Sequence, residues 1–399
     1  MSAKRTIIFN RGCGKQRGAV LMVMLVIMIV GIAAILVNSL SSTTLKNARQ
    51  ANTAAALAQA KDALIGFAIT YGDTHTTSPQ VHGYLPCPDT SGSPEGSASP
   101  PCGSKDVNVI GRLPWATLDL SALRDGDGEC MWYAVSGNYK DSPKTSLMNW
   151  DTNGQLQAFS SDGTLLTQPD NQVVAVIFAP GAAQSGQDRS GTTAPVCGGN
   201  YTATNYLDND TVHSINNADI ATGKFIQGAS SGSVNDQMLF ITRQDIWNAI
   251  KKRNDFNAMV SSLLSIAIAC SSPPVTVDFG TTPPTETAGV TVGSLKIGRV
   301  PKACLASPWN NWQDNLLYAT CTSGKCINVN SCDGVVIFSG ERNTSQTRIT
   351  NADKNTWSNY LENTPSANLT AFTTGGTSFS GASLYSATSP STDVVACIP

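Results

Sequence analysis

The longest apolar stretch of the chain lies near its N-terminus. Residues 19–37, AVLMVMLVIMIVGIAAILV, contain no charged side chain. As a helix, this stretch would be about 28 Å long, close to the roughly 30 Å of a bilayer's hydrocarbon core. The preceding residues 1–18 carry five basic side chains and no acid, and such segments stay on the cytoplasmic side of a membrane. The pattern therefore predicts one membrane-spanning helix over residues 19–37.

Helical periodicity continues beyond the apolar stretch. Residues 43–71 contain no proline, and apolar side chains recur there at helical spacing. The members of this apolar stripe are Leu57, Ala60, Leu64, Ala68 and Tyr71. We expect one helix over residues 19–72, with its stripe packed on a globular head. A proline-containing loop follows the helix.

A second amphipathic pattern covers residues 242–272, and its polar run Lys251-Lys252-Arg253 makes it too polar to span a membrane. Its apolar positions are Ile246, Ile250, Val260, Leu263, Leu264 and Ala267. Two short segments, VVAVIFA at 173–179 and GVVIFS at 334–339, are continuously apolar, as central strands buried on both faces are.

Four short motifs occur twice, in the same order. The pairs are GRLP at 111–114 with GRVP at 298–301, MWYA at 131–134 with LLYA at 316–319, VIFAPG at 176–181 with VIFSG at 336–340, and NYLDN at 205–209 with NYLEN at 359–363. Four matches in one order indicate an internal duplication. The prediction is an α+β protein whose two tandem heads each pack a helix on a mainly antiparallel sheet. Its parts are a leader (1–18), an N-terminal helix (19–72), a first head (73–241), a second helix (242–272) and a second head (273–399).

The junction Lys15-Gln16-Arg17-Gly18 before Ala19 resembles the N-terminus of the type IV pilin and type II secretion pseudopilin superfamily. The segment GRLPWATLDLSALRDGDGECMWYAVSG at 111–137 is similar to one found in large pilin-like proteins associated with type II secretion. The resemblance implies that a prepilin peptidase cuts between Gly18 and Ala19 and methylates the new amino terminus. It also implies a single pass through the inner membrane, periplasmic heads, assembly with other pilins or pseudopilins through the N-terminal helix, and final placement in a pilus or at the cell surface.

One position departs from the family pattern. The fifth residue of the mature chain is usually a glutamate that pairs with a neighbouring subunit's terminal amine, but Val23 stands there. The tip pseudopilin of type II secretion also lacks this acid, so the resemblance implies a minor subunit at or near the filament tip. Three alternatives remain: a secretory signal cut near Ala33-Ala34, an uncleaved anchor, and an anchored periplasmic binding protein or enzyme that does not polymerise.

Composition supports a location outside the cytoplasm. Only 14% of residues are charged and the net charge is -2, so the chain has no excess of positive charge that would attract nucleic acid. Of the 11 cysteines, Cys13 lies in the leader, and the remaining even number can pair fully in an oxidising compartment. These disulfide candidates are Cys87, Cys102, Cys130, Cys197, Cys270, Cys304, Cys321, Cys326, Cys332 and Cys397. Bonds should stay within the first head or within the second helix and second head, with Cys87–Cys102 favoured. Zinc at Cys321, Cys326 and Cys332 is the alternative, but no histidine or second CxxC pair completes such a site.

Candidate chemistry is sparse. Residues 228–232 match GxSxG, but the predicted loop and strand after them do not fit a nucleophile elbow, so we expect a turn and no enzyme activity. His75, His82 and His213 form no catalytic pattern with other residues. Asp125, Asp127 and Glu129 alternate with glycines, as calcium ligands do, although a plain Asp-Gly turn explains the same sequence.

Overall fold

The computed structural model describes residues 17–75, 81–91, 94–145, 147–169, 171–228, 234–281, 283–328, 331–364 and 367–399. The predicted leader therefore lies outside the described residues, apart from Arg17 and Gly18. Contacts divide the chain into two compact units, and the boundary along the chain falls between Asn52 and Thr53.

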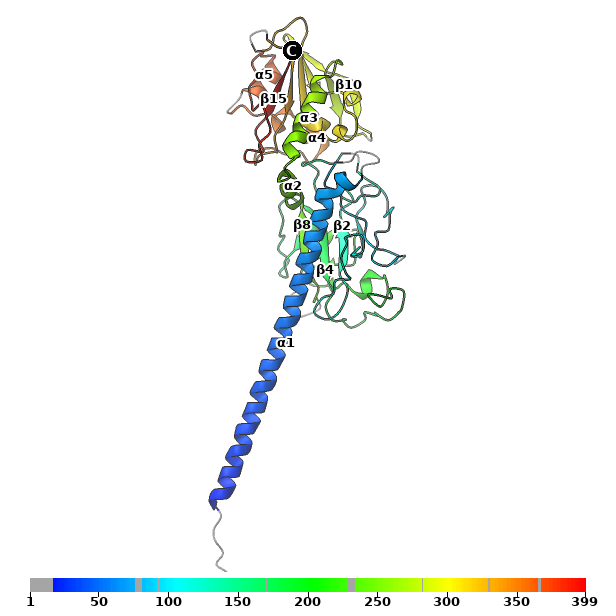
Figure 1. Ribbon diagram of the computed structural model, residues 1–399, viewed down its shortest axis with the longest axis vertical. Coiled ribbons are helices and arrows are strands. Elements are labelled where there is room, and N and C mark those ends of the chain that lie inside the picture. The colour runs from blue at the N-terminus through cyan, green and yellow to red at the C-terminus, as the bar shows by residue number, and fades with distance from the viewer. Residues whose placement is uncertain are drawn as a thin grey trace, which may run out of the picture. The chain divides into compact units, whose positions relative to one another are not determined.

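Helix α1 extends from Arg17 to Thr74, and its second half packs on the first sheet. The whole predicted stripe from Leu57 to Tyr71 is buried, with Ala60, Leu64 and Ala68 completely so. This confirms the predicted helix over 43–71, and Figure 1 shows it beside β2, β4 and β8.

Among the side chains that the structure describes, no helix is both long enough and apolar enough to cross a membrane. The side chains of residues 17–21, 23, 31 and 33–42 lie outside that description. The membrane span over residues 19–37 therefore stays a prediction.

The first head is built on a four-stranded antiparallel sheet in the order β1-β2-β4-β8. Its strands are β1 (Val109–Arg112), β2 (Trp132–Val135), β4 (Val173–Ala179) and β8 (Gln237–Thr242). Every residue of β4 is buried, which confirms the prediction of a central strand. Tyr133 and Ile177 face α1, whereas Trp132, Val176 and Phe178 face a layer of loops.

The loop layer of the first head contains only short elements. These are β3 (Gln157–Phe159) paired with β7 (Lys224–Ile226), β5 (Asn209–Asp210) paired with β6 (Ile215–Asn216), and the 3-10 turn η1 (Ala203–Asn205). Phe225 and Tyr206 are the large side chains that this layer buries against the sheet. The sheet thus has a helix on one face and an irregular layer on the other.

The predicted second helix is two helices, α2 (Arg243–Lys251) and α3 (Phe256–Ile268). The apolar positions predicted for it are buried. The break falls in the polar run after Lys251, because the Arg253 guanidinium turns back to bond Asp255, Asp73 and the carbonyl oxygen of Ile69. A single continuous helix was therefore wrong at this point, and the turn ties α2 and α3 to the end of α1.

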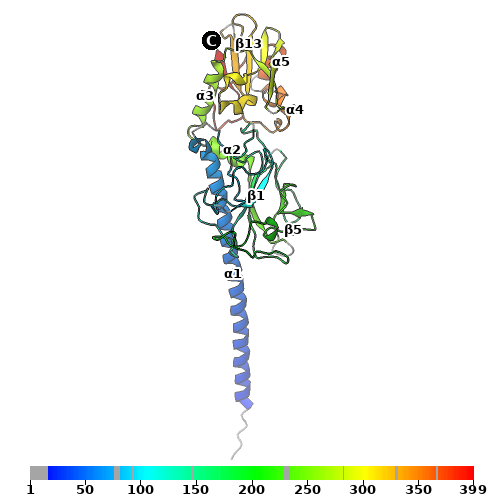
Figure 2. The ribbon, with the colours of Figure 1, turned by 90° about the vertical axis from the view of Figure 1, so that its right-hand side faces the viewer.

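The second head repeats the architecture with a seven-stranded sheet, in which β10-β9-β12-β13-β14-β15 follow one another and β11 pairs with β12. Its strands are β9 (Val275–Asp278), β10 (Thr285–Ala288), β11 (Val290–Val292), β12 (Leu295–Arg299), β13 (Leu316–Cys321), β14 (Gly334–Phe338) and β15 (Val394–Ile398). Its short helices are η2 (Lys302–Cys304), η3 (Trp309–Asn315), α4 (Asn351–Lys354), η4 (Trp357–Asn359) and α5 (Asn368–Thr374). Figure 2 shows α3 on one side of this sheet and α4 and α5 on the other.

Strand pairing relates the two heads residue by residue. Gly111 lies opposite Tyr133 in the first sheet, and Gly298 lies opposite Tyr318 in the second. The next strand requires a shift of one residue from the sequence alignment, because Tyr133 lies opposite Ile177 and Tyr318 opposite Val336. The sequence alignment of VIF at 176–178 with VIF at 336–338 was therefore wrong by one position. Side chains alternate between the two faces of a strand, so a slip of one residue would have exchanged core and loop faces.

The two heads share one hydrophobic core cluster, which includes residues of α1, both sheets, α2 and α3. At its centre, the Trp150 ring meets the Trp312 ring edge-on at 5.1 Å, and Trp247 meets Trp312 at 5.7 Å. Residues 53–399 accordingly form one compact unit. The second head is packed on the first through apolar contact, in addition to their connection along the chain.

Candidate functional site

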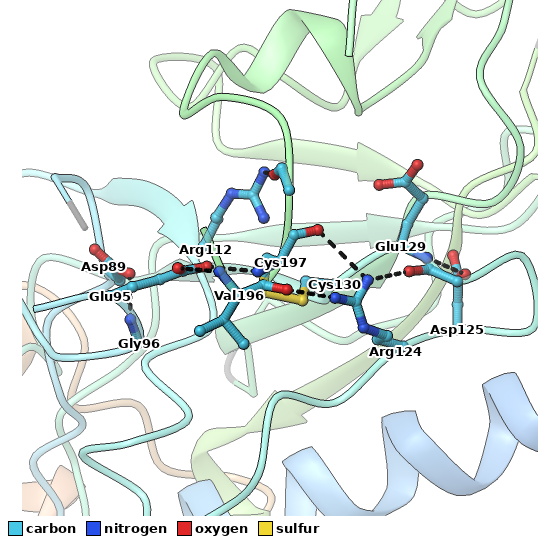
Figure 3. The surroundings of a disulfide bond; sticks show 12 residues. Asp89, Glu95, Gly96, Arg112, Arg124, Asp125, Glu129, Cys130, Val196 and Cys197 are labelled. Carbon is cyan, nitrogen blue, oxygen red and sulfur yellow. Dashed lines mark hydrogen bonds between the residues drawn. A yellow bond between two sulfur atoms is a disulfide. The ribbon is translucent and has the colours of Figure 1, made fainter. Parts of the chain in front are cut away.

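Side chains of the segment 111–137 bind neighbouring loops of the first head. Arg124 donates to the carbonyl oxygens of Gly128, Val196 and Cys197, and the Cys130–Cys197 disulfide lies beside it, as Figure 3 shows. The Glu95 carboxylate accepts from the backbone N–H groups of Val196 and Cys197 at 2.7 Å each. These charged side chains hold loops together.

Arg112 of the GRLP motif is buried among aromatic rings. Its guanidinium lies 4.9 Å from the Tyr206 ring centroid and 5.7 Å from that of Trp132, and it donates to the carbonyl oxygens of Gly198 and Asn200. Arg189 lies 5.0 Å from the same Tyr206 ring. Cation–π contacts between desolvated partners contribute up to about 2 kcal/mol each, so this stack stabilises the loop layer.

The second head repeats this arginine–tyrosine stack. Arg299 and Arg348 lie 4.2 and 4.4 Å from the ring centroid of Tyr360. Arg348 donates to the carbonyl oxygens of Gly340 and Asn359, as Arg189 does to those of Gly181 and Asn205. The duplicated motifs therefore encode a buried side-chain arrangement in each head. The motifs recur in the sequence because the same side chains pack together in both heads.

Each head also contains a pair of carboxyl groups, of which one member, Asp208 or Glu362, belongs to a repeated motif and the other does not. In the first head, Asp236 accepts from the backbone N–H of Asp208, and its pKa is raised well above the ordinary value by burial and by Asp208. In the second head, burial and Glu362 raise the pKa of Asp393 to about 7. Asn217 and Asn368 each donate to the aspartate of their own head, at 2.9 and 3.1 Å.

The two pairs also have matching glutamine partners. Gln187 donates to Asp208 at 2.9 Å, and Gln346 donates to Glu362 at 3.0 Å. One oxygen of Asp236 and one of Asp393 have no hydrogen-bond partner among the described residues. Two carboxyl groups buried side by side retain a proton near neutral pH, since burial and mutual repulsion both disfavour the doubly charged state.

The predicted calcium ligands are engaged by protein groups. Asp125 accepts from the backbone N–H groups of Asp127, Glu129 and Gly181, and Glu129 pairs with Arg189 at 3.3 Å. The geometry is that of an Asp-Gly turn. In the described part of the chain, no group of three or more acidic, histidine or cysteine side chains is arranged to hold a metal ion.

The other candidate residues are separated in space or lie outside the description. His213 pairs with Asp210, His82 lies 4.0 Å from Asp73, and His75 stacks on Tyr71. Of the GxSxG segment, only Gly228 is described. Gly18 and Ala19 lie in the first turns of α1, and the side chain of Val23 is outside the description.

The ten cysteines after the leader form five disulfides. They are Cys87–Cys102, Cys130–Cys197, Cys270–Cys304, Cys321–Cys326 and Cys332–Cys397. Each bond joins cysteines of the same predicted half of the chain, and none of the three clustered cysteines is left as a thiolate for zinc. Multiple disulfides are typical of proteins folded outside the cytoplasm.

Comparisons with family models, with curated proteins and with solved structures find no match for this chain.

Proposed function

We propose that this chain is a minor pilin or pseudopilin-like structural subunit of a type IV pilus or type II secretion filament, placed at or near the filament tip. The observation that carries the proposal is the junction of a basic leader ending in Gly18 with an apolar stretch from Ala19. In a subunit that polymerises through its N-terminal helix, a membrane-spanning helix continues into a globular head, and the sequence predicts the same organisation for this chain.

Three features of the fold support this proposal. Helix α1 continues without interruption to Thr74, and its second half is buried on the first sheet. The disulfides are consistent with a periplasmic or surface location. The ionisable side chains of the motif segment bind backbone groups of their own head, which suits a structural role.

The first test is a substitution at the processing site. Gly18→Arg is expected to leave an uncut precursor in the inner membrane and to remove the protein from sheared filament fractions. Gly14→Arg is the matched control, because it adds the same charge to the leader but leaves the residue before the cut unchanged. Normal processing of Gly18→Arg would refute the proposal, as would equal loss of processing in both variants.

The second test concerns position in the filament. Val23→Glu restores the acid that pairs with a neighbouring subunit's amine, and the variant is expected to enter positions below the tip. Val26→Glu is the control, because it places the same costly charge in the apolar stretch at a position without that partner. Immunogold labelling along the filament for Val23→Glu alone supports tip placement of the natural chain. Labelling confined to the ends in both variants contradicts it.

A further inference from the structure

The second sheet ends in a strand whose outer edge is open. β10 (Thr285–Ala288) is the last strand in the order of that sheet, and all four of its residues are exposed. Figure 1 shows β10 at the side of the second head. Among the residues that the structure describes, no hydrogen bond from outside the sheet reaches the backbone groups of Glu286 or Ala288.

The other ends of the two sheets are covered by the chain itself. Asp89 exchanges two backbone hydrogen bonds with the last residue of β1. On β8, the ammonium group of Lys61 donates to the carbonyl oxygen of Phe240 at 3.0 Å. On β15, the N–H of Val395 donates to the carbonyl oxygen of Ala382 at 2.9 Å. Such covers hinder pairing with another chain, and in the described part of this chain β10 lacks one.

The direction of the backbone groups of β10 follows from one hydrogen bond at its end. The N–H of Gly289 donates to the carbonyl oxygen of Pro274 at 2.9 Å, on the side of β9. A Cβ at Gly289 would fall 2.6 Å from that oxygen, so only glycine fits this close approach. Because successive residues of a strand direct their backbone groups to opposite sides, Glu286 and Ala288 direct theirs away from β9. The N–H and C=O groups of both residues are therefore available to another strand.

The composition of this edge favours pairing. Residues 285–292, TETAGVTV, are rich in β-branched side chains and contain neither proline nor a basic residue. Their one charged side chain is Glu286, whose carboxylate accepts from the backbone N–H of Lys302 at 2.7 Å and from the amide of Gln313. Since this charge is bound to its own head, it does not repel an incoming strand.

A second copy of the chain fits this edge. An antiparallel pair about a two-fold axis at Thr287 places Glu286 of each copy opposite Ala288 of the other. The residues with outward backbone groups then face one another and can exchange four hydrogen bonds. The two Thr287 side chains lie opposite each other, which is a favourable cross-strand pair, and no like charges meet.

We propose that two copies of this chain associate by antiparallel pairing of their β10 strands, so that the sheets of the two second heads form one continuous sheet. This inference goes beyond the proposed structural role. The pairing depends on β10, whereas processing depends on Gly18, so either claim can fail while the other holds.

Cysteine cross-linking of the full chain in detergent tests the register. In the proposed pair, the Cα atoms of the two Thr287 residues are about 4.5 Å apart, within reach of a disulfide, whereas those of the two Thr285 residues are about 14 Å apart. Both variants carry Cys13→Ser, because Cys13 is the one cysteine outside the five disulfides. Under mild oxidation, Thr287→Cys is expected to form linked dimers about 10-fold faster than its matched control Thr285→Cys. Equal rates, or no dimer from Thr287→Cys, overturn the proposal.

A charge at the two-fold axis tests the same pairing without a covalent bond. Thr287→Lys places two ammonium groups opposite each other and is expected to weaken dimerisation about 5-fold, as measured by sedimentation velocity of the full chain over a range of concentrations. Thr285→Lys is the control, because it adds the same charge to the same face of β10 but lies opposite Gly289 of the other copy. A natural chain that is monomeric at every concentration overturns the proposal, as does equal dimerisation of the two lysine variants.

Discussion

Removing the carboxylate of Asp151 should destabilise the joined heads more than any surface charge change. The Asp151–Arg348 pair has no exposed surface on either side chain, and Asn315 donates to the same Asp151 oxygen at 2.9 Å. Asp151→Ala leaves the Arg348 guanidinium buried without its counter-charge. Breaking a buried pair in this way costs about 3–5 kcal/mol.

The free energy of unfolding is measured by guanidinium denaturation, followed by tryptophan fluorescence of the full chain in detergent. Trp150 and Trp312 lie next to the pair and report on the junction. Glu129→Gln is the control, because it breaks the partly exposed Glu129–Arg189 pair in the first head, for a cost of at most about 1 kcal/mol.

A second variant separates loss of charge balance from loss of packing. Asp151→Leu combined with Arg348→Met removes both charges and should recover most of the stability lost in Asp151→Ala, because neither member of the pair is then left buried without the other. If Asp151→Ala costs no more than Glu129→Gln, or if the double variant is less stable than Asp151→Ala, the argument for a buried bridge between the heads is refuted.

Two further predictions concern the second carboxyl pair and the first disulfide. The pKa of Asp393 is about 7 in the folded chain and ordinarily 3.8, so the folded state holds an extra proton between those values. Stability should fall by up to about 1.4 kcal/mol per unit as the pH rises from 4 to 7, and Asp393→Asn should flatten this slope in denaturation curves. An unchanged slope would contradict the proton assignment. Cys87→Ser opens a disulfide that spans 15 residues and should cost about 3 kcal/mol, measured against the natural chain under non-reducing conditions; a cost below 1 kcal/mol would show that the loop is ordered by other contacts.

The pattern of apolar residues in the sequence was sufficient to predict the buried face of the long helix and the strands at the centre of each sheet. The stripe of α1 from Leu57 to Tyr71 is apolar at helical spacing and is buried as expected. β4 and β14 are continuously apolar because both faces of a central strand are covered, by a helix on one side and by loops or short helices on the other. The preference for Cys87–Cys102 came from the short proline- and serine-rich loop between them, and the structure contains that bond.

Other features depend on contacts that sequence spacing does not encode. Asp236 and Asp393 lie far along the chain from Asp208 and Glu362, and they meet them only because β8 and β15 begin beside the NYLDN and NYLEN loops. The break after α2 arises from the bonds that Arg253 makes to residues at the end of α1. The acids at 125–129 match a calcium loop in spacing, and the sequence did not reveal that Asp125 accepts from the backbone N–H groups of Asp127 and Glu129.

The N-terminus of the mature protein tests the central claim most directly. Mass spectrometry of the chain purified from membranes, with peptide sequencing of its first residues, distinguishes the alternatives. The proposal predicts that the mature chain begins with N-methylated Ala19 and lacks residues 1–18. A chain that retains Met1, or one cut after Ala34 by a signal peptidase, would contradict it.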